Sequence, residues 1–213
     1  MRLARERADV VRLAGRLRPD GLVVGRSGNL SARRGDLVAI TPSGLDYDDL
    51  DPDLVCLVTL DGAVVEAALE PSAELPMHLA AYRRTGAGAL VHTHSPFATA
   101  VACTEDELPP IHYLIAELGG GVRVAPYATF GTEELGERIA EALEGRAAAL
   151  LRSHGAITIG DTLDQAYERS LILESIAAIY VHARALGVPK PLPDEELAVL
   201  AERFAGYGQE RPR

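Results

Sequence analysis

The sequence contains no apolar run that approaches the about 20 residues needed by a membrane-spanning helix. The start of the chain also lacks the pattern of a signal peptide, because Arg2, Arg5, Arg7 and Arg12 interrupt each apolar run there. We therefore expect no membrane span and no membrane partner, and we expect a cytoplasmic location.

Cysteine is scarce, since only Cys56 and Cys103 occur in 213 residues. Both lie in apolar stretches, and neither has the spacing of a metal-binding motif. A disulfide framework is therefore excluded as the basis of the fold, and the pattern predicts two buried thiols, as is typical of a cytosolic protein.

Basic residues are outnumbered, with 21 Lys and Arg against 31 Asp and Glu, so the formal net charge is −10. This balance argues against nucleic acid as a partner, because a phosphate backbone calls for a basic surface. A small anionic substrate stays compatible with the charge, because a few backbone N–H groups can bind one phosphate locally. The plain reading of the charge is solubility.

What the sequence does contain is typical of a globular protein, with 47% hydrophobic and 24% charged residues. The length suits one substantial core, and no repeat, low-complexity tract or linker divides the chain. We expect a single domain over residues 1–213.

Hydrophobic periodicity predicts helices and strands in alternation. The predicted helices cover residues 2–18, 73–84, 96–103, 113–118, 132–143, 163–186 and 193–204. The predicted strands cover residues 37–40, 54–60, 64–65, 88–93, 122–124, 148–151 and 156–159, and the glycine-containing segment 21–31 is predicted as a loop. Thr132 is predicted to cap the helix that follows it. Interleaved helices and strands, with hairpin-like pairs among them, indicate one mixed α/β fold.

The strongest chemical signal is His92-Thr93-His94 at the end of an apolar strand. Side chains two apart on a strand point to the same face, so His92 and His94 could reach one ion. His154 follows another apolar run and could be a third ligand, and Glu74 stands at the start of a predicted helix. A catalytic zinc site commonly uses three protein ligands and keeps a position open. Each histidine taken singly could also be an ordinary hydrogen-bonded residue, and the spacing does not identify the metal.

Three further histidines lie outside this pattern. His78 is one helical turn after Glu74, so it could be a fourth ligand or could support the site through packing and hydrogen bonds. His112 is interpreted as a structural residue that could also touch a substrate, and His182 as a residue without chemistry.

Seven short blocks resemble a known family in their order along the chain. They are Gly-Asn-Leu-Ser at 28–31, Thr-Pro-Ser-Gly at 41–44, Pro-Ser-Ala-Glu at 71–74, His-Thr-His at 92–94, Ile-His-Tyr at 111–113, Ala-Pro-Tyr-Ala-Thr-Phe-Gly-Thr at 125–132 and His-Gly at 154–155. From about residue 20 to about residue 185 the chain is similar to the class II aldolase/adducin family, and within it to the aldolases of L-fuculose 1-phosphate.

The resemblance implies a three-layer α/β/α sandwich with a mixed, largely antiparallel central sheet. It implies metal-dependent cleavage of a ketose 1-phosphate, such as L-fuculose 1-phosphate, to dihydroxyacetone phosphate and a small aldehyde through a stabilised enediolate. The implied assembly is a homotetramer with active sites at subunit interfaces.

The resemblance also implies a role for individual residues. His92, His94 and His154 would hold Zn²⁺, with Mn²⁺ or Co²⁺ left open, and Glu74 would be the catalytic acid/base. Tyr113 would donate a proton to the aldehyde oxygen from across a subunit interface. The remaining implied residues are Asn29, Ser43, Gly44 and Ser72 for the phosphate, and Phe130, Thr132 and the loosely aligned Tyr207 for the aldehyde.

Other reactions on the same scaffold are alternatives. The family's pentulose-phosphate 4-epimerases carry Asp where this chain has Glu74, and they differ after residue 110, so we favour an aldolase. A thiosugar-phosphate dehydratase can also carry Glu at this position. A non-catalytic adducin-like module is disfavoured because the three histidines and the carboxylate are all present.

One position departs from the family pattern. The aldolases that the chain resembles have Ser-Ser-Glu where it has Ser72-Ala73-Glu74, so one hydroxyl near the expected phosphate is missing. Either the substrate lacks a phosphate, or another donor replaces the hydroxyl. Arg26 is a candidate, because a guanidinium binds phosphate with paired hydrogen bonds. We expect a phosphorylated ketose, since the other implied phosphate residues remain.

Overall fold

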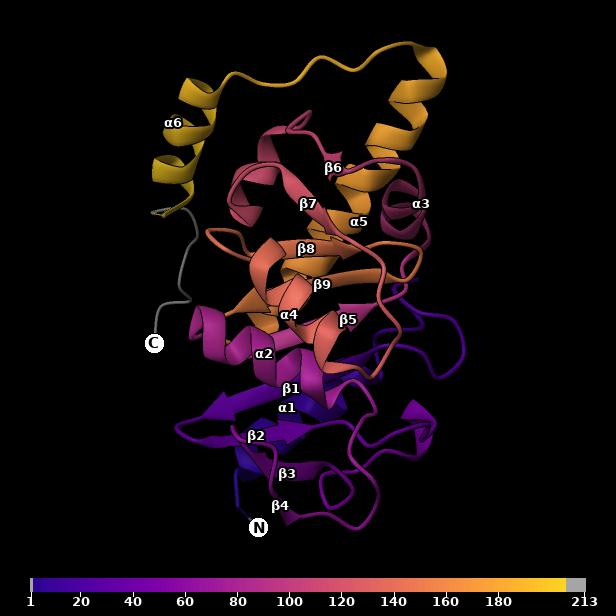
Figure 1. Ribbon diagram of the computed structural model, residues 1–213, viewed down its shortest axis with the longest axis vertical. Helices are drawn as coiled ribbons and strands as arrows, with labels where there is room; N and C mark the ends of the chain where they lie inside the picture. Colours follow the sequence, from indigo (N-terminus) through magenta and orange to yellow (C-terminus); the bar gives the residue numbers. More distant parts are fainter. Residues whose placement is uncertain (1, 206–213) are drawn as a thin grey trace, which may run out of the picture.

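The computed structural model of the chain describes residues 2–205. The strands are β1 (Asn29–Arg34), β2 (Leu37–Ile40), β3 (Cys56–Thr59), β4 (Val64–Glu66), β5 (Ala89–Thr93), β6 (Glu107–Leu108), β7 (Val122–Ala125), β8 (Ala148–Leu151) and β9 (Gly155–Gly160). They form one sheet in the order β4-β3-β2-β1-β5-β9-β8-β7-β6. The strands lie across the molecule and follow one another along its long axis (Figure 1). Only the pair β7–β8 is parallel within this described sheet, so the expected mixed and largely antiparallel sheet is confirmed.

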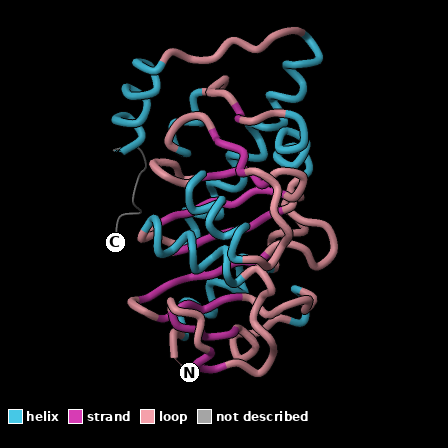
Figure 2. Tube along the Cα trace, viewed as in Figure 1, coloured by secondary structure: helices cyan, strands magenta, loops and turns pink. Residues whose placement is uncertain are grey.

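Helices cover both faces of the sheet. They are α1 (Ala4–Ala14), α2 (Leu75–Thr85), α3 (Pro96–Thr104), α4 (Glu133–Ala142), α5 (Leu163–Leu186) and α6 (Asp194–Ala205), with short 3₁₀ helices η1 (Tyr47–Asp49) and η2 (Tyr113–Leu118). The α2–α4 pair lies in front of the strands in the view of Figure 2, and α1, α3 and α5 pack against the other face.

The side chains of β5 show how the sheet separates two cores. Leu90 packs into the apolar cluster that contains residues of α2 and α4, whereas Ala89 and Val91 pack into the cluster that contains residues of α1 and the start of α5. This alternation follows from the two-residue period of a strand. It places His92, two residues after Leu90, on the α2–α4 face.

Several predicted elements match the structure closely. Helix α5 has the predicted bounds and is followed by Gly187. Thr132 caps α4, because its Oγ1 accepts a hydrogen bond from the backbone N–H of Leu135. The predicted first helix was too long, since α1 ends at Ala14.

The predicted loop over residues 21–31 was wrong at its end, because Asn29–Arg34 forms the central strand β1, paired with β2 and β5. Its buried residues include Asn29 and Ser31, whose polar side chains hide the apolar signature of a buried strand. Strand β6 was also missed, because two residues are too short to show a period.

The interpretation of the cysteines was correct for one of the two. Cys56 is buried, but Cys103 is exposed near the end of α3, and both are free thiols. No helix among residues 2–205 is long and apolar enough to cross a membrane.

Candidate metal centre

Four candidate ligands meet at one end of strands β5 and β9. His92 lies in β5 and His94 just after it, while His154 lies in the tight turn before β9. The antiparallel pairing of β5 with β9 sets Thr93 opposite Ala156 and so brings this turn beside the end of β5. Glu74 reaches the same point from the N-terminus of α2.

Two glycines allow the backbone to come this close. A Cβ at Gly155 would collide with the Thr93 carbonyl oxygen. Gly28 has a φ of +79°, and a Cβ there would lie 2.8 Å from the His92 carbonyl oxygen. A larger residue at either position would push the chain away from the histidines.

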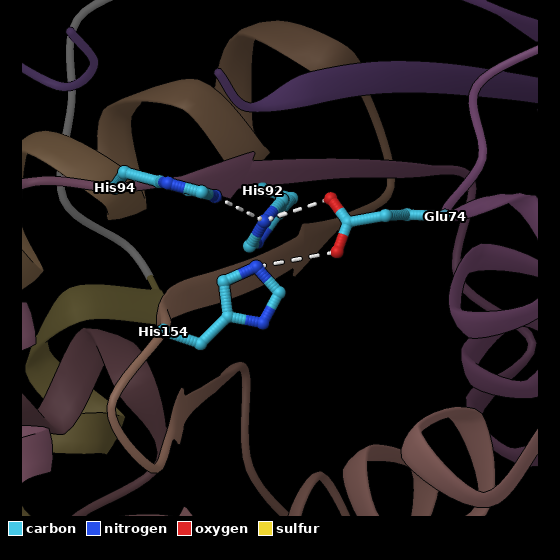
Figure 3. A group of neighbouring side chains, drawn as sticks. All are labelled: Glu74, His92, His94 and His154. Carbon is cyan, nitrogen blue, oxygen red and sulfur yellow. Dashed lines mark hydrogen bonds and ion pairs between the residues drawn. The ribbon is translucent and has the colours of Figure 1, made fainter. Parts of the chain in front are cut away.

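The four side chains point toward one another, as Figure 3 shows. One possible ligand atom from each lies within 4.8 Å of the others. The Nε2 atom of His92 is 3.0 Å from Nε2 of His94 and 3.1 Å from Oε2 of Glu74. The Nε2 atom of His154 is 3.3 Å from Oε1 of Glu74.

This arrangement fits a divalent cation. The Nδ1 atom of His92 lies 2.9 Å from the Ala156 carbonyl oxygen, which can only accept, so Nδ1 carries the hydrogen and Nε2 turns its lone pair to the cluster. Oε1 of Glu74 is buried and has no hydrogen-bond partner. A cation would satisfy these atoms, and three imidazoles with one carboxylate are a suitable ligand set for zinc.

The electrostatics keep the cluster in the protonation states that a metal needs. Burial works to raise the pKa of Glu74, but the neighbouring His92 and His154 and the hydrogen bond from Asn29 outweigh it, so this pKa lies below its usual range. Burial and repulsion from His92 and His154 lower the pKa of His94 to about 3. Burial, followed by repulsion from His92, also lowers the pKa of His154. At neutral pH the carboxylate is therefore ionised and these two imidazoles are neutral.

A cavity of about 370 Å³ opens beside the cluster. The predicted site residues in its lining are Asn29, Ser43, Gly44, Ser72, Glu74, His94, Phe130 and His154. His92 lies beneath them and is fully buried. The structure therefore brings the implied metal, acid/base and phosphate residues together at one cavity.

Besides His92, the predicted site residues Tyr113 and Thr132 are not in this lining. Tyr113 is half-exposed on η2 and stacks on Phe204 of α6. Thr132 serves as the cap of α4. Tyr207 lies outside the described residues.

The polar end of the cavity is formed by two loops that are tied together. An isolated bridge joins Pro42 to Pro71, and the backbone N–H of Ser72 donates to the Thr41 carbonyl oxygen at 3.1 Å. Arg26 also lines the cavity, and its Nη1 donates to the Gly44 carbonyl oxygen at 3.2 Å. The guanidinium proposed from the sequence therefore lies at the loops expected to hold a phosphate.

Sequence reasoning gave no role to several residues of the lining, among them Tyr47, Tyr127 and Ser153. The hydroxyl of Tyr47 donates to the carbonyl oxygens of Ser27 and Gly28 and so holds the glycine loop in place. Tyr127 belongs to the block at 125–132, which could have signalled it. Tyr47 and Ser153 lie in segments with no such motif.

The other histidines do not join the cluster. Both ring nitrogens of the buried His78 are engaged, by Ser31 and by Asn29, so it is not a fourth ligand. His112 accepts a hydrogen bond from the backbone N–H of Leu114 at the start of η2. His182 lies beside the ring of Phe97, with the ring centroids 5.6 Å apart.

Comparisons with protein families, with other sequences and with solved structures all give class II aldolases. The family model "Class II Aldolase and Adducin N-terminal domain" matches residues 8–181. The chain is 43% identical to the 5-deoxy-D-ribulose 1-phosphate aldolase of Bacillus thuringiensis serovar kurstaki, over 99% of this chain and 100% of that one. It is 42% identical to the L-fuculose phosphate aldolase of Escherichia coli (strain K12), over 88% of each chain. A solved L-fuculose 1-phosphate aldolase superposes with a TM-score of 0.92 at 38% identity, over 94% of this chain and 96% of that one.

Proposed function

The chain belongs to the class II aldolase and adducin family, and we propose that this aldolase cleaves a ketose 1-phosphate into dihydroxyacetone phosphate and a small aldehyde. L-Fuculose 1-phosphate and 5-deoxy-D-ribulose 1-phosphate are the candidate substrates, because aldolases named for them resemble the chain over most of its length. The observation that carries the proposal is the cluster of three histidines and Glu74 at a cavity with a polar end.

We propose that His92, His94 and His154 hold Zn²⁺, and that Glu74 contacts or adjoins the ion. When bound, the cation supplies positive charge beside the substrate's carbonyl and neighbouring hydroxyl oxygens, where negative charge develops as the carbon–carbon bond breaks. Neutral imidazoles support this role because they leave the ion its full positive charge.

Glu74 is proposed to move the proton at carbon. In the direction of synthesis its ionised carboxylate removes a proton from the hydroxylated carbon beside the ketone, and the resulting carbon nucleophile attacks the aldehyde. Tyr113 donates its phenolic proton to the aldehyde oxygen, and a proton passed from Glu74 to Tyr113 then restores both groups. Cleavage follows the same steps in reverse.

Tyr113 is proposed to act in the site of a neighbouring copy of the chain. It is half-exposed and is not part of the cavity in its own chain, so a second copy is required to bring it to the substrate. A homotetramer, as implied by the resemblance, would supply that copy at each site.

The polar end of the cavity is proposed to bind the phosphate through Asn29, Ser43, Gly44 and Ser72, with Arg26 in place of the hydroxyl missing at Ala73. Phe130 and Tyr127 border the aldehyde end, and Thr132 shapes it through the cap of α4.

The test is a screen of the zinc-loaded protein against both ketose 1-phosphates, a pentulose 5-phosphate and a thiosugar phosphate. We expect the release of dihydroxyacetone phosphate and an equal amount of aldehyde from at least one ketose 1-phosphate. Epimerisation or loss of water without aldehyde release would overturn the proposal. Reconstitution with Mn²⁺ or Co²⁺ in parallel tests the choice of metal.

A further inference from the structure

A line of buried hydrogen bonds runs from α2 and β1 to the acid/base. The hydroxyl of Tyr82 is 2.7 Å from Oγ of Ser31, which is 2.7 Å from Nδ1 of His78. Nε2 of His78 is 2.6 Å from Oδ1 of Asn29, and Nδ2 of Asn29 is 2.8 Å from Oε2 of Glu74. We call Tyr82, Ser31, His78 and Asn29 the buried polar chain; each is at most 5% exposed.

The buried polar chain is built from two matching stripes. Glu74, His78 and Tyr82 are spaced four residues apart at the start of α2 and along it, so they share one face of the helix. Asn29 and Ser31 are two apart on β1 and share one face of the strand. The polar side chains of the two stripes alternate in the contact between α2 and β1, a place that apolar side chains would otherwise fill.

Donor and acceptor chemistry gives these bonds one direction. An ionised carboxylate only accepts, so the amide of Asn29 turns its NH₂ group to Glu74 and its oxygen to His78. The oxygen must accept, so Nε2 of His78 donates. The ring of His78 is fully buried and its nitrogens contact only the uncharged side chains of Ser31 and Asn29, so the ring is neutral and its Nδ1 accepts.

The remaining two bonds follow from that tautomer. Because Nδ1 of His78 carries a lone pair, Ser31 must donate its hydroxyl hydrogen to it. Oγ of Ser31 is then left to accept from the hydroxyl of Tyr82. Every hydrogen in the line therefore points toward the carboxylate of Glu74, and each bond depends on the one before it.

We propose that the buried polar chain positions the acid/base, with His78 setting the orientation of the Asn29 amide that holds Oε2 of Glu74. His78 and Asn29 are thus positioning residues for Glu74, and the His78 side chain neither lines the cavity nor belongs to the group of candidate metal ligands. The effect on turnover rests on the aldolase function proposed above, whereas the tautomer and the amide orientation do not.

The same orientation matters for an anionic substrate. Asn29 lines the cavity and its Nδ2 donates one hydrogen to Glu74, which leaves the second hydrogen of the NH₂ group for a phosphate in that cavity. With NH₂ turned this way it offers a donor to each anion. If the Asn29 amide were flipped, its oxygen would face the carboxylate of Glu74 and its NH₂ group would face the N–H at Nε2 of His78. The Nε2–H tautomer of His78 therefore disfavours the flip, because two donors would then face each other.

The first experiment reads the tautomer directly. Nitrogen–proton correlation spectra of the metal-loaded protein with ¹⁵N-labelled histidine distinguish Nε2–H from Nδ1–H rings, and His78→Gln assigns the signal. We expect neutral His78 protonated at Nε2 at neutral pH. A proton on Nδ1, or a charged ring, would overturn the proposal whether or not the protein is an aldolase.

The second experiment compares His78→Gln with His78→Leu. Glutamine can still donate to Oδ1 of Asn29, whereas leucine has a similar volume and no donor. We expect kcat per metal-loaded chain to fall roughly ten- to a hundredfold in His78→Leu and to be largely restored in His78→Gln. A purely structural role would lower the melting temperature and leave the two variants with equal kcat once folded and loaded, which would contradict the proposal.

Ser31→Ala gives an independent arm if His78→Leu does not fold. Loss of the donor to Nδ1 leaves only the bond to Oδ1 of Asn29 to fix the tautomer, so the spectra should show a minor Nδ1–H population and kcat should fall by a smaller factor of about threefold to tenfold. A single Nε2–H tautomer with unchanged kcat in Ser31→Ala would show that the buried polar chain does not act through His78.

Discussion

The metal cluster and the segment around Tyr113 are proposed to serve one reaction, but the chain builds them in different ways. Glu74, His92 and their two partner histidines support one another within a single chain, in a buried or half-buried setting. Tyr113 lies half-exposed on η2 against Phe204 and away from the cavity. The contrast supports the proposal that one copy binds the metal and the sugar phosphate, whereas the proton path is completed by a second copy.

The strongest test of the comparison removes one imidazole from the cluster. We expect His92→Ala to lose both bound metal and turnover, because the buried nitrogen at the centre of the site disappears. Metal content per chain and aldehyde release are the measurements, and the exposed His182→Ala is the matched control. Stoichiometric metal in His92→Ala would show that the cluster is held together in another way.

A second variant separates metal binding from chemistry within the cluster. Glu74→Gln keeps the shape of the side chain but cannot take a proton from carbon, so we expect turnover to fall by about 10²-fold or more while substrate still binds. Steady-state kinetics with a direct binding measurement will check this. Near-normal turnover would assign the acid/base role to another group.

The segment around Tyr113 is tested by mixing subunits of two variants. Tyr113→Phe should slow cleavage by about 10- to 10²-fold with little change in metal content. Subunits that carry Tyr113→Phe, when reassembled with subunits that carry His92→Ala, should regain activity at interfaces with one intact metal site and one intact tyrosine. Activity no higher than that of the separate variants would count against a shared site.

A smaller effect is expected at the phosphate end of the cavity. Arg26→Ala should weaken the binding of dihydroxyacetone phosphate roughly tenfold or more, because a charge-assisted hydrogen bond is lost, and should leave the use of dihydroxyacetone unchanged. Ala73→Ser should compensate in part by restoring a hydroxyl. Equal use of the two donors by the unaltered protein would exclude a phosphate requirement, and an unchanged KM in Arg26→Ala would exclude Arg26 as the substitute donor.

The smallest effect concerns the stability of the buried region. The pKa of His78 is about 3 in the folded protein, against the ordinary value of about 6.5 in the unfolded chain. Between these two pH values the His78 ring binds a proton in the unfolded chain but not in the folded protein. The free energy of unfolding therefore falls as the pH drops below about 6.5. The limiting slope is about 1.4 kcal/mol per pH unit.

Replacement of His78 should remove this contribution. Urea unfolding of the metal-free protein between neutral and mildly acid pH should therefore give a flatter loss of stability in His78→Gln than in the unaltered chain. His182→Gln, at an exposed position, is the matched control. Parallel curves for the unaltered chain and His78→Gln would show that the His78 ring takes up a proton in the folded protein.

Local patterns in the sequence were sufficient for much of the fold. Helix α5 combines an apolar period with a capping threonine and a terminal glycine, so its bounds were predictable. Strand β1 was not, because the burial of Asn29 and Ser31 depends on partners from α2 that lie far away in the sequence.

By itself, the sequence determined the metal-binding potential of His92 and His94, because strand geometry alone puts residues two apart on one face. Its ordered blocks also determined the family. The tertiary structure alone decided that His78 holds Asn29, that Asn29 holds Glu74, and that Tyr113 lies outside the cavity of its own chain. Such relations depend on which faces of distant elements meet. The direction of a hydrogen bond depends on every partner of its donor and acceptor, and those partners come together only when helix α2 packs on strand β1.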